Sequence, residues 1–238
     1  MKIAFSWDDG ALEDQKLFEL HEKYEIPGMF FVPTRNCEGR EVLTPQMMRE
    51  AESKYVRFGG HTENHTYLTN IPAAEVEQEV LLNKVYLENT LGHTVGDFCL
   101  PGGKYTEEIN KTIYKYYKTI RTADTMNFQY KGGILKPAIH FFPRGNNSLL
   151  GNAVRNQSYS QIAYVATHYK EKYFDLVKGL IQNENGKKDS VIMIWGHSWE
   201  IEQYNLWNEL ECLMQMDYIR NNTVMYQEIF SVAEDVKK

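Results

Sequence analysis

The sequence predicts an α/β fold formed by a single domain over residues 1–238. Short apolar runs alternate with longer amphipathic stretches along the whole chain, an order typical of β-α units rather than of separate sheet and helix domains. A chain of 238 residues, 42% of them hydrophobic, is long enough to bury one large core. The sequence contains no internal repeat or low-complexity tract that would indicate another architecture.

Eight short apolar runs are expected to form the strands, and they lie at residues 3–7, 29–32, 55–59, 95–100, 118–122, 138–142, 191–195 and 223–226. In alternating β/α proteins the functional groups collect at the C-terminal ends of the strands, because the loops there surround the open end of the sheet or barrel. Polar residues that directly follow these runs are therefore the first candidates for a site.

Capping residues mark where several helices begin and end. Thr44 stands before Pro45, which predicts an N-cap followed by a first-turn proline. Pro72 opens a long helix that should end in a left-handed cap at Gly92. Thr106 predicts the N-cap of the next helix.

Later segments show weaker patterns. Residues 158–182 are expected to form one or two helices, and residues 206–220 another. The Gly- and Asn-rich stretch 144–152 is expected to be a long surface loop.

Charge and cysteine content exclude several classes of protein. The 26 Lys and Arg against 32 Asp and Glu give a net charge of −6 without a basic tract, which argues against binding of nucleic acid. The apolar runs are far shorter than the roughly 20 residues that cross a bilayer, so we expect no membrane span. Three widely spaced cysteines without a Cys-x-x-Cys pair argue against disulfides and a cysteine zinc site. The N-terminus does not resemble a signal peptide, and we expect a cytoplasmic protein.

Four polar clusters follow predicted strands and should therefore lie on one face of the fold. They are Asp8 with Asp9, His61 with His65, residues 101–103, and His197. Asp8 and Asp9 alone would also fit a turn that caps a helix, and His197 alone would fit a ring packed on Trp195 or Trp199. The coincidence of four clusters on one face favours a functional site. His140, near the end of another predicted strand, is a further candidate.

The two histidines of the segment His-Thr-Glu-Asn-His at residues 61–65 stand four positions apart. This spacing brings both imidazoles to one side of a helical turn, where they can share one ion. Either Asp8 or Asp9 can supply a carboxylate. Two histidines and one carboxylate form an open site for zinc or another first-row divalent metal, with positions left for water and substrate. The second aspartate is then free to act on that water.

Four segments also carry a resemblance to a known family. They read Ser-Trp-Asp-Asp-Gly at 6–10, His-Thr-Glu-Asn-His at 61–65, Cys-Leu-Pro-Gly-Gly at 99–103 and Ile-Trp-Gly-His at 194–197. In order and spacing they resemble the first, second, third and fifth motifs of the NodB-homology polysaccharide deacetylases, carbohydrate esterase family 4. The match to the second motif, His-Ser/Thr-x-x-His, is complete. The resemblance extends over most of the chain, from residue 3 to about residue 199.

The resemblance implies a distorted (β/α) barrel of about seven strands, fewer than in a regular eight-fold barrel. It also implies a metal-dependent hydrolase that removes N-acetyl or O-acetyl groups from a polysaccharide, an oligosaccharide or a sugar conjugate, with a metal-bound water as the nucleophile. The metal expected is zinc, with cobalt, nickel and manganese as alternatives. The partner expected is an acetylated saccharide substrate.

The family's roles carry over residue by residue. The resemblance makes Asp8 the general base, His197 the general acid, and Asp9, His61 and His65 the metal ligands. The oxyanion would be held by the metal and by the backbone N–H of Gly102, next to Pro101 in the third motif. Trp195 and Trp199 are expected to form a wall for the sugar acetyl group, and Glu200 to bind a hydroxyl group or the imidazole.

The sequence departs from the family in two motifs. The arginine of the third motif, which orients the base in the family, is replaced by Cys99, and we expect Arg121 to reach Asp8 from a neighbouring position instead. The fourth motif, an Asp and Trp pair in many members, has no clear counterpart. Asp124 is the nearest acid, and the partner of His197 is left unassigned.

Two other functions stay open at this point. One is hydrolysis of an amide that is not a sugar, as in the allantoinase-like members of the superfamily, since the site would look the same. The other is a carbohydrate-binding protein that keeps the fold without turnover, which the missing arginine of the third motif would favour.

Overall fold

Seven parallel strands form the central sheet of the computed structural model, which describes residues 1–235 and the side chains of residues 1–231. The strands are β1 (Lys2–Asp8), β2 (Gly28–Val32), β3 (Val56–Gly60), β4 (Asp97–Cys99), β5 (Thr119–Arg121), β6 (Ile139–His140) and β7 (Val191–Gly196). Their order across the sheet is β5-β4-β3-β2-β1-β7-β6. The expected fold class, a distorted barrel of about seven strands, is confirmed.

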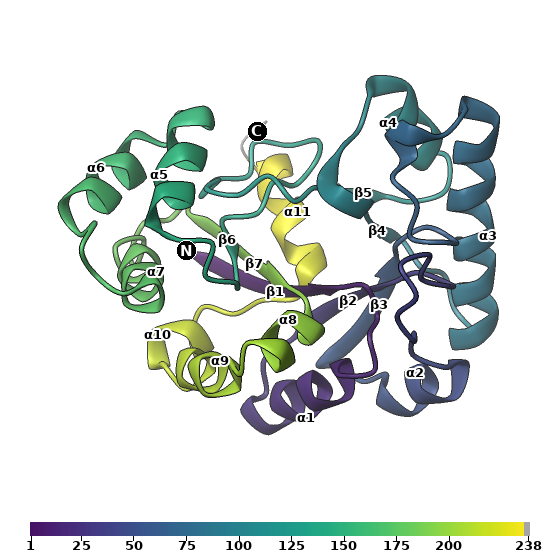
Figure 1. Ribbon diagram of the computed structural model, residues 1–238, viewed down its shortest axis with the longest axis horizontal. Coiled ribbons are helices and arrows are strands. Elements are labelled where there is room, and N and C mark those ends of the chain that lie inside the picture. The colour runs from purple at the N-terminus through teal and green to yellow at the C-terminus, as the bar shows by residue number, and fades with distance from the viewer. Residues whose placement is uncertain (236–238) are drawn as a thin grey trace.

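Helices surround the strands (Figure 1). They are α1 (Asp14–Tyr24), α2 (Pro45–Ala51), α3 (Ala73–Leu91), α4 (Glu107–Ile113), α5 (Asn146–Arg155), α6 (Tyr159–Thr167), α7 (Tyr173–Gln182), α8 (Ser198–Gln203), α9 (Trp207–Met214), α10 (Asp217–Arg220) and α11 (Tyr226–Asp235), with short 3-10 turns η1 (Leu68–Asn70) and η2 (Pro101–Gly103). Figure 1 shows α3 and α4 beside β4 and β5, and the group α5 to α7 at the opposite side of the molecule. No helix among the described residues is long and apolar enough to cross a membrane.

The caps expected from the sequence are confirmed. The hydroxyl groups of Thr44 and Thr106 accept hydrogen bonds from backbone N–H groups in the first turns of α2 and α4. Gly92 ends α3 with a φ of 76°, the left-handed conformation that glycine adopts without a steric cost. Local chemistry alone therefore set these helix ends.

Three expectations about secondary structure are wrong. Residues 144–152 are not a loop, because α5 begins at Asn146 and buries Leu149 and Ala153 against the core. Residues 223–226 are not a strand, because only Thr223 bridges to Ile3 before α11 begins. Residues 206–220 form two helices, α9 and α10, where one was expected. Residues 158–182 form two helices, as one of the two expected alternatives had it.

Side chains alternate between the two faces of the sheet and so separate two cores. On β1, Phe5 and Trp7 pack in the larger cluster under the helices, whereas Ala4 belongs to a second cluster. That second cluster also contains Tyr226 and Ile229, so α11 packs against the opposite face of the sheet. Since side chains alternate along a strand, Asp8 shares the face of Ala4.

The two edges of the sheet are linked by the segment between β5 and β6. The N–H of Leu135 donates to the carbonyl of Ile120 on β5 over 2.8 Å, and the N–H of Ala138 donates to the carbonyl of Met193 on β7 over 2.9 Å. These bonds join the segment to β5 at one edge and to β7 beside the other edge of the half-barrel. The curvature brings residues at the C-terminal end of β5 close to the end of β1.

Trp7 is fixed beside the first aspartate by His21 of α1. The indole Nε1 donates to Nε2 of His21 over 2.7 Å, and Nδ1 of His21 donates to the carbonyl of Ile26 over 2.6 Å. His21 is fully buried, and this burial lowers its pKa to about 4, against an ordinary value of 6.5. The folded protein therefore holds His21 in its neutral form.

We predict a stability change that depends on His21. Because the unfolded chain takes up the proton at a higher pH than the folded chain, the free energy of unfolding falls as the pH drops from about 6.5 toward 4. His21 should account for a loss of about 2 kcal/mol between pH 7 and pH 5. Urea denaturation at both pH values should show that His21→Gln lacks this loss, whereas the exposed control His93→Gln keeps it. Equal pH dependence in the wild type and His21→Gln would contradict the assignment.

Candidate active site

A cavity of about 550 Å³ contains the polar residues that follow β1, β3 and β7. The residues of the predicted clusters that line it are Asp8, Asp9, His61, His65, Gly102 and His197. Arg121 is fully buried behind them, and Pro101 is buried without lining the cavity. Most of the site residues predicted from the sequence therefore lie together at the C-terminal ends of the strands.

Asp9, His61 and His65 form a compact buried cluster. Oδ1 of Asp9 lies 3.5 Å from Nε2 of His61 and 3.0 Å from Nε2 of His65. The two imidazoles converge as expected, but not on a helical turn, since residues 61–65 form a loop. Asp9 and His65 have φ angles of 77° and 56°, a left-handed conformation that costs non-glycine residues about 1–3 kcal/mol. This backbone conformation directs the side chains of Asp9, His61 and His65 toward one another.

These three residues fit a divalent metal. Nδ1 of His61 faces the carbonyl oxygen of Cys99 at 2.8 Å, and a carbonyl only accepts, so Nδ1 carries the proton of the neutral ring. Nε2 of His61 is then a lone pair that faces a carboxylate oxygen. That oxygen, Oδ1 of Asp9, is buried and has no hydrogen-bond donor among the described residues. Ligand atoms about 2.0–2.1 Å from a tetrahedral ion lie roughly 3.3 Å apart, close to the separations observed.

Neighbouring side chains keep the Asp9 carboxylate ionised. Burial alone would raise the pKa of Asp9, but the charge of His197 and the polar contacts of His61 and His65 hold it well below its ordinary value. Trp199 donates its indole Nε1 to the other oxygen of Asp9 over 2.9 Å. Trp199 therefore orients the candidate ligand and lines the cavity as well.

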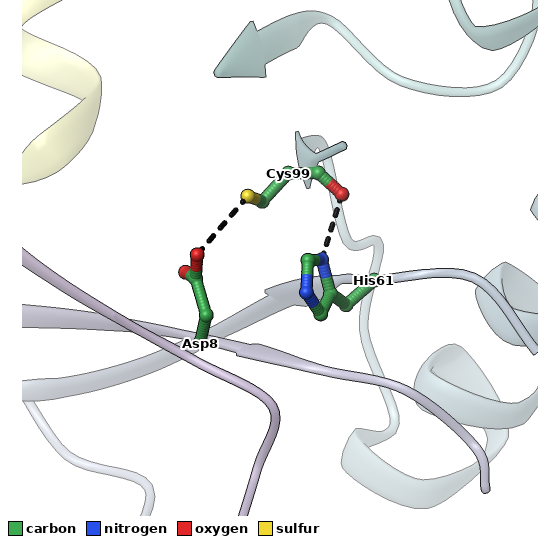
Figure 2. Close-up of side chains that lie close together, drawn as sticks. All are labelled: Asp8, His61 and Cys99. Atoms are coloured by element: carbon green, nitrogen blue, oxygen red, sulfur yellow. Dashed lines mark hydrogen bonds between the residues drawn. The ribbon is translucent and has the colours of Figure 1, made fainter. Parts of the chain in front are cut away.

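Asp8 has different partners from Asp9. Arg121 donates to Oδ1 of Asp8 through Nη2, and the thiol of Cys99 donates to Oδ2 over 3.5 Å (Figure 2). Arg121 also donates to the carbonyl of Thr122 over 2.9 Å. Burial alone would lower the pKa of Arg121, but Asp8 raises it, so the guanidinium stays charged. The contact expected between Arg121 and Asp8 is thus present.

The register of the sheet explains how Arg121 reaches Asp8 although it lies on β5. Cys99 on β4 and Arg121 on β5 are paired neighbours in parallel strands. Such neighbours lie about 4.8 Å apart and point to the same face, so a long side chain from β5 reaches the position that one from β4 would occupy. Arg121 lies between the rings of Phe31 and Trp195, each 5.2 Å from its guanidinium carbon.

Cys99 does not form a second ligand set with Asp8 and His61, although the three lie close together (Figure 2). Burial raises the pKa of the Cys99 thiol well above its ordinary value, so it remains protonated. The thiol proton is directed at Asp8, and the Cys99 carbonyl is bound to His61. Of the two aspartates that the sequence left open, Asp9 is the one placed to ligate an ion with His61.

His197 is held by Glu200 and His140, neither of which belongs to the family motifs. Nδ1 of His197 donates to Oε2 of Glu200 over 2.7 Å, and His140 donates Nε2–H to the same oxygen over 2.9 Å. Arg144 donates Nε–H to Nδ1 of His140 over 3.1 Å, which fixes the tautomer of His140. Asp124, the acid nearest to the fourth motif, pairs with Lys136 instead. Short contacts to one shared oxygen indicate hydrogen bonding rather than metal ligation for this trio.

The charges of this trio follow from burial and from one another. Burial lowers the pKa of His140 to about 4, so His140 is neutral. Burial alone would raise the pKa of Glu200, but His140 and His197 lower it to about 2. Burial alone would lower the pKa of His197, but Asp9 and Glu200 raise it to about 9. His197 therefore carries a proton at neutral pH, with Nε2 lying 3.9 Å from Oδ2 of Asp9.

Gly102 lies in η2 with a φ of 63°, below the ring of Tyr67. A Cβ atom at this position would approach that ring to 2.9 Å, so both the conformation and the space require glycine.

Trp195 lines the cavity and stacks on His140 with ring centroids 4.0 Å apart.

Several lining residues were missed by sequence reasoning. They are Glu38, Arg40 and Tyr67 from loops, and Ser148, Asn152 and Arg155 from α5. Ser148, Asn152 and Arg155 are separated by four and by three positions, a spacing that places them on one face of a helix. The sequence pattern predicted a loop over residues 144–152, so this face was not recognised. His140 and Glu200 were considered, but nothing in the sequence connected them to each other.

The profile of the polysaccharide deacetylase family matches residues 1–119, half of the 238 residues. The chain belongs to the polysaccharide deacetylase family. A peptidoglycan-N-acetylglucosamine deacetylase of Bacillus cereus is 26% identical to this deacetylase-family chain over 121 residues, which covers 50% of this chain and 54% of the relative. The match thus spans about half the length of that curated relative.

Solved structures extend the likeness of this deacetylase-family protein over almost the whole fold. A family 4 acetyl xylan esterase from Clostridium thermocellum, in complex with a cobalt ion, is similar over 98% of this chain and 91% of its own, with a TM-score of 0.60 and 13% identity. A deacetylase of Streptococcus pyogenes in complex with acetate covers 56% of this chain and 61% of its own, with a TM-score of 0.52 and 22% identity. At these identities the likeness shows the shared fold.

We predict that the cluster around Asp9 binds a metal ion. Protein exposed to zinc or cobalt and then desalted should retain about one ion per chain, as three convergent ligands allow. The double variant His61→Ala, His65→Ala should lose the ion, because only one ligand remains. Elemental analysis measures both, and the double variant His93→Ala, His168→Ala, whose two histidines lie outside the cavity, serves as the matched control. Equal metal content in the two double variants would show that the ion binds elsewhere.

Proposed function

We propose that this protein is a divalent-metal-dependent hydrolase that removes an acetyl group, in the first place an N-acetyl group, from a saccharide. One observation carries the proposal: the lone pair of His61 and the free carboxylate oxygen of Asp9 face each other in the same cavity as Asp8 and His197. Membership of the deacetylase family supports the class of reaction. Zinc is the metal we propose, with cobalt, nickel or manganese as alternatives. The cytoplasmic location expected from the sequence stays a prediction.

The residues divide the work of hydrolysis between them. When bound by Asp9, His61 and His65, a divalent ion would supply a Lewis acid that polarises the acyl carbonyl and lowers the pKa of water. Asp8 takes the proton of the attacking water, and Arg121 holds Asp8 in place for that transfer. The backbone N–H of Gly102 is our proposed donor to the oxyanion.

His197 completes the reaction as the general acid. Its Nε2 is the nitrogen left for the substrate, because Nδ1 is bound to Glu200. A protonated His197 can give its proton to the departing amine, which would otherwise be a poor leaving group. Glu200 stabilises the imidazolium form, and His140 keeps Glu200 in position.

Arg121 also bears on the alternative of an inactive carbohydrate-binding protein. That alternative was favoured by the missing arginine of the third motif, but a guanidinium from β5 contacts the base instead. An arginine that is fully buried against a carboxylate requires the ion pair to balance its desolvation. Its presence supports a base that is oriented for turnover.

We predict that acetate is released from N-acetylated chito-oligosaccharides in the presence of zinc or cobalt. Asp8→Asn should reduce kcat by at least about 100-fold, because the base is lost while the shape of the side chain is kept. Asp175→Asn, an exposed position on α7 outside the cavity, is the control and should retain most of the activity. Enzymatic acetate assays with purified protein test both variants.

The outcomes separate the candidate functions. Opening of the allantoin ring to allantoic acid, with no release of acetate from sugars, would favour the amide hydrolase that does not act on sugars. Saccharide binding that is equal in the wild type and Asp8→Asn, with no turnover in either, would overturn the proposal in favour of a binding protein.

We further predict that Glu200 acts on kcat through His197. Glu200→Gln removes the charge that stabilises the imidazolium and should lower kcat about 10- to 100-fold, with KM and metal content changed little. Glu202→Gln, on the same helix but exposed, is the control. A rise in KM without a fall in kcat would assign Glu200 to substrate binding instead.

A further inference from the structure

One wall of the catalytic cavity is formed by α5. Ser148, Asn152 and Arg155 line the cavity at the spacing of a single helix face, and Arg144 lines it just before the helix begins. These residues lie in the same cavity as Asp8 and His197. A substrate that fills the cavity would therefore contact them with a part that does not react.

The wall is fixed to the barrel by amide side chains. Nδ2 of Asn152 donates to Oγ1 of Thr125 over 3.0 Å. Nδ2 of Asn156 donates to Oδ1 of Asp124 over 3.0 Å and to the carbonyl of Thr125 over 2.7 Å. All three acceptor atoms belong to Asp124 and Thr125, in the segment that links β5 to β6. Arg155 stands between these two anchored positions, so its backbone has a defined place relative to the catalytic residues.

The wall carries positive charge that no carboxylate neutralises. Among residues 1–231, no carboxylate oxygen lies within 4 Å of the guanidinium of Arg144 or Arg155, whereas Arg40 pairs with Glu38. The guanidinium of Arg144 donates a hydrogen bond to His140, which is neutral. Asp124, the acid next to the wall, is already paired with Lys136 over 3.2 Å.

We propose that the substrate carries an anionic group, a carboxylate or a phosphate, which binds Arg155 and Arg144 while its acetyl group lies at Asp8 and His197. This inference rests on the proposed deacetylase function. Guanidinium groups bind carboxylate and phosphate oxygens through paired N–H donors, and Ser148 and Asn152 add neutral donors beside them. The chain as a whole has a net charge of −6 and repels anions, so a local positive wall is needed to bind one.

The experiment compares three substrates of similar size. They are methyl N-acetylglucosaminide, which is neutral, N-acetylmuramic acid, which bears a carboxylate, and N-acetylglucosamine 6-phosphate. Acetate release gives kcat/KM for each. The wild type should favour an anionic sugar over the neutral one by about tenfold, and the preference should weaken as salt is added. The better of the two anionic substrates identifies the group.

Arg155→Gln is the test variant, because Arg144 also holds His140. The ratio of kcat/KM for the anionic over the neutral sugar should fall about tenfold in Arg155→Gln. Arg49→Gln removes the same charge from the exposed face of α2, away from the cavity, and should leave the ratio as in the wild type. An unchanged ratio in Arg155→Gln, or a wild type that favours the neutral sugar, would overturn the inference and leave the proposed function standing.

A second measurement separates the two proposals. If no sugar releases acetate, the proposed function fails, and calorimetry then measures binding of N-acetylglucosamine 6-phosphate and N-acetylmuramic acid directly. Binding that weakens about tenfold in Arg155→Gln but not in Arg49→Gln would support the anion site by itself. No binding of either sugar to the wild type would overturn it.

Discussion

The close approach of two buried acceptors, a carboxylate oxygen of Asp9 and Nε2 of His61, is the feature on which the rest of this site depends. The two atoms lie 3.5 Å apart without a hydrogen bond between them, which makes this position the candidate site for a cation. The strained backbone at Asp9 and His65 is a consequence, because ordinary turns would direct these side chains elsewhere. The packed strands β1 and β3, which end just before these residues, stabilise the strained conformation.

Two ion pairs flank this cluster and balance the other buried charges. Asp8 is paired with Arg121, and His197 is paired with Glu200. An unpaired charge at this depth would be strongly destabilising, so each catalytic candidate needs its partner for folding as well as for chemistry. The partners come from places that the family motifs do not specify. Arg121 replaces the expected arginine through the neighbouring strand, and Glu200 follows His197 on the first turn of α8.

Sequence reasoning succeeded where short-range chemistry decides the outcome. The caps at Thr44 and Gly92 need only their own neighbours, and seven of the expected strands formed at the predicted places. It failed for residues 144–152, where the helix depends on burial of Leu149 and Ala153 against distant parts of the chain. It failed for residues 223–226 because Tyr226 is buried in the second core at the start of α11, and tertiary packing outweighs a short apolar pattern.

The sequence by itself determined the fold class, the family and the set of residues that could meet at the ends of the strands. It could do so because alternation of apolar runs and the spacing of the two histidines are local properties of the chain. Only the tertiary structure decided that His140 and Glu200 hold His197, and that Arg155 of α5 and Arg144 just before it line the cavity without a carboxylate partner among the described residues. Those contacts join residues far apart in the sequence, and their geometry depends on strand register and on the curl of the sheet.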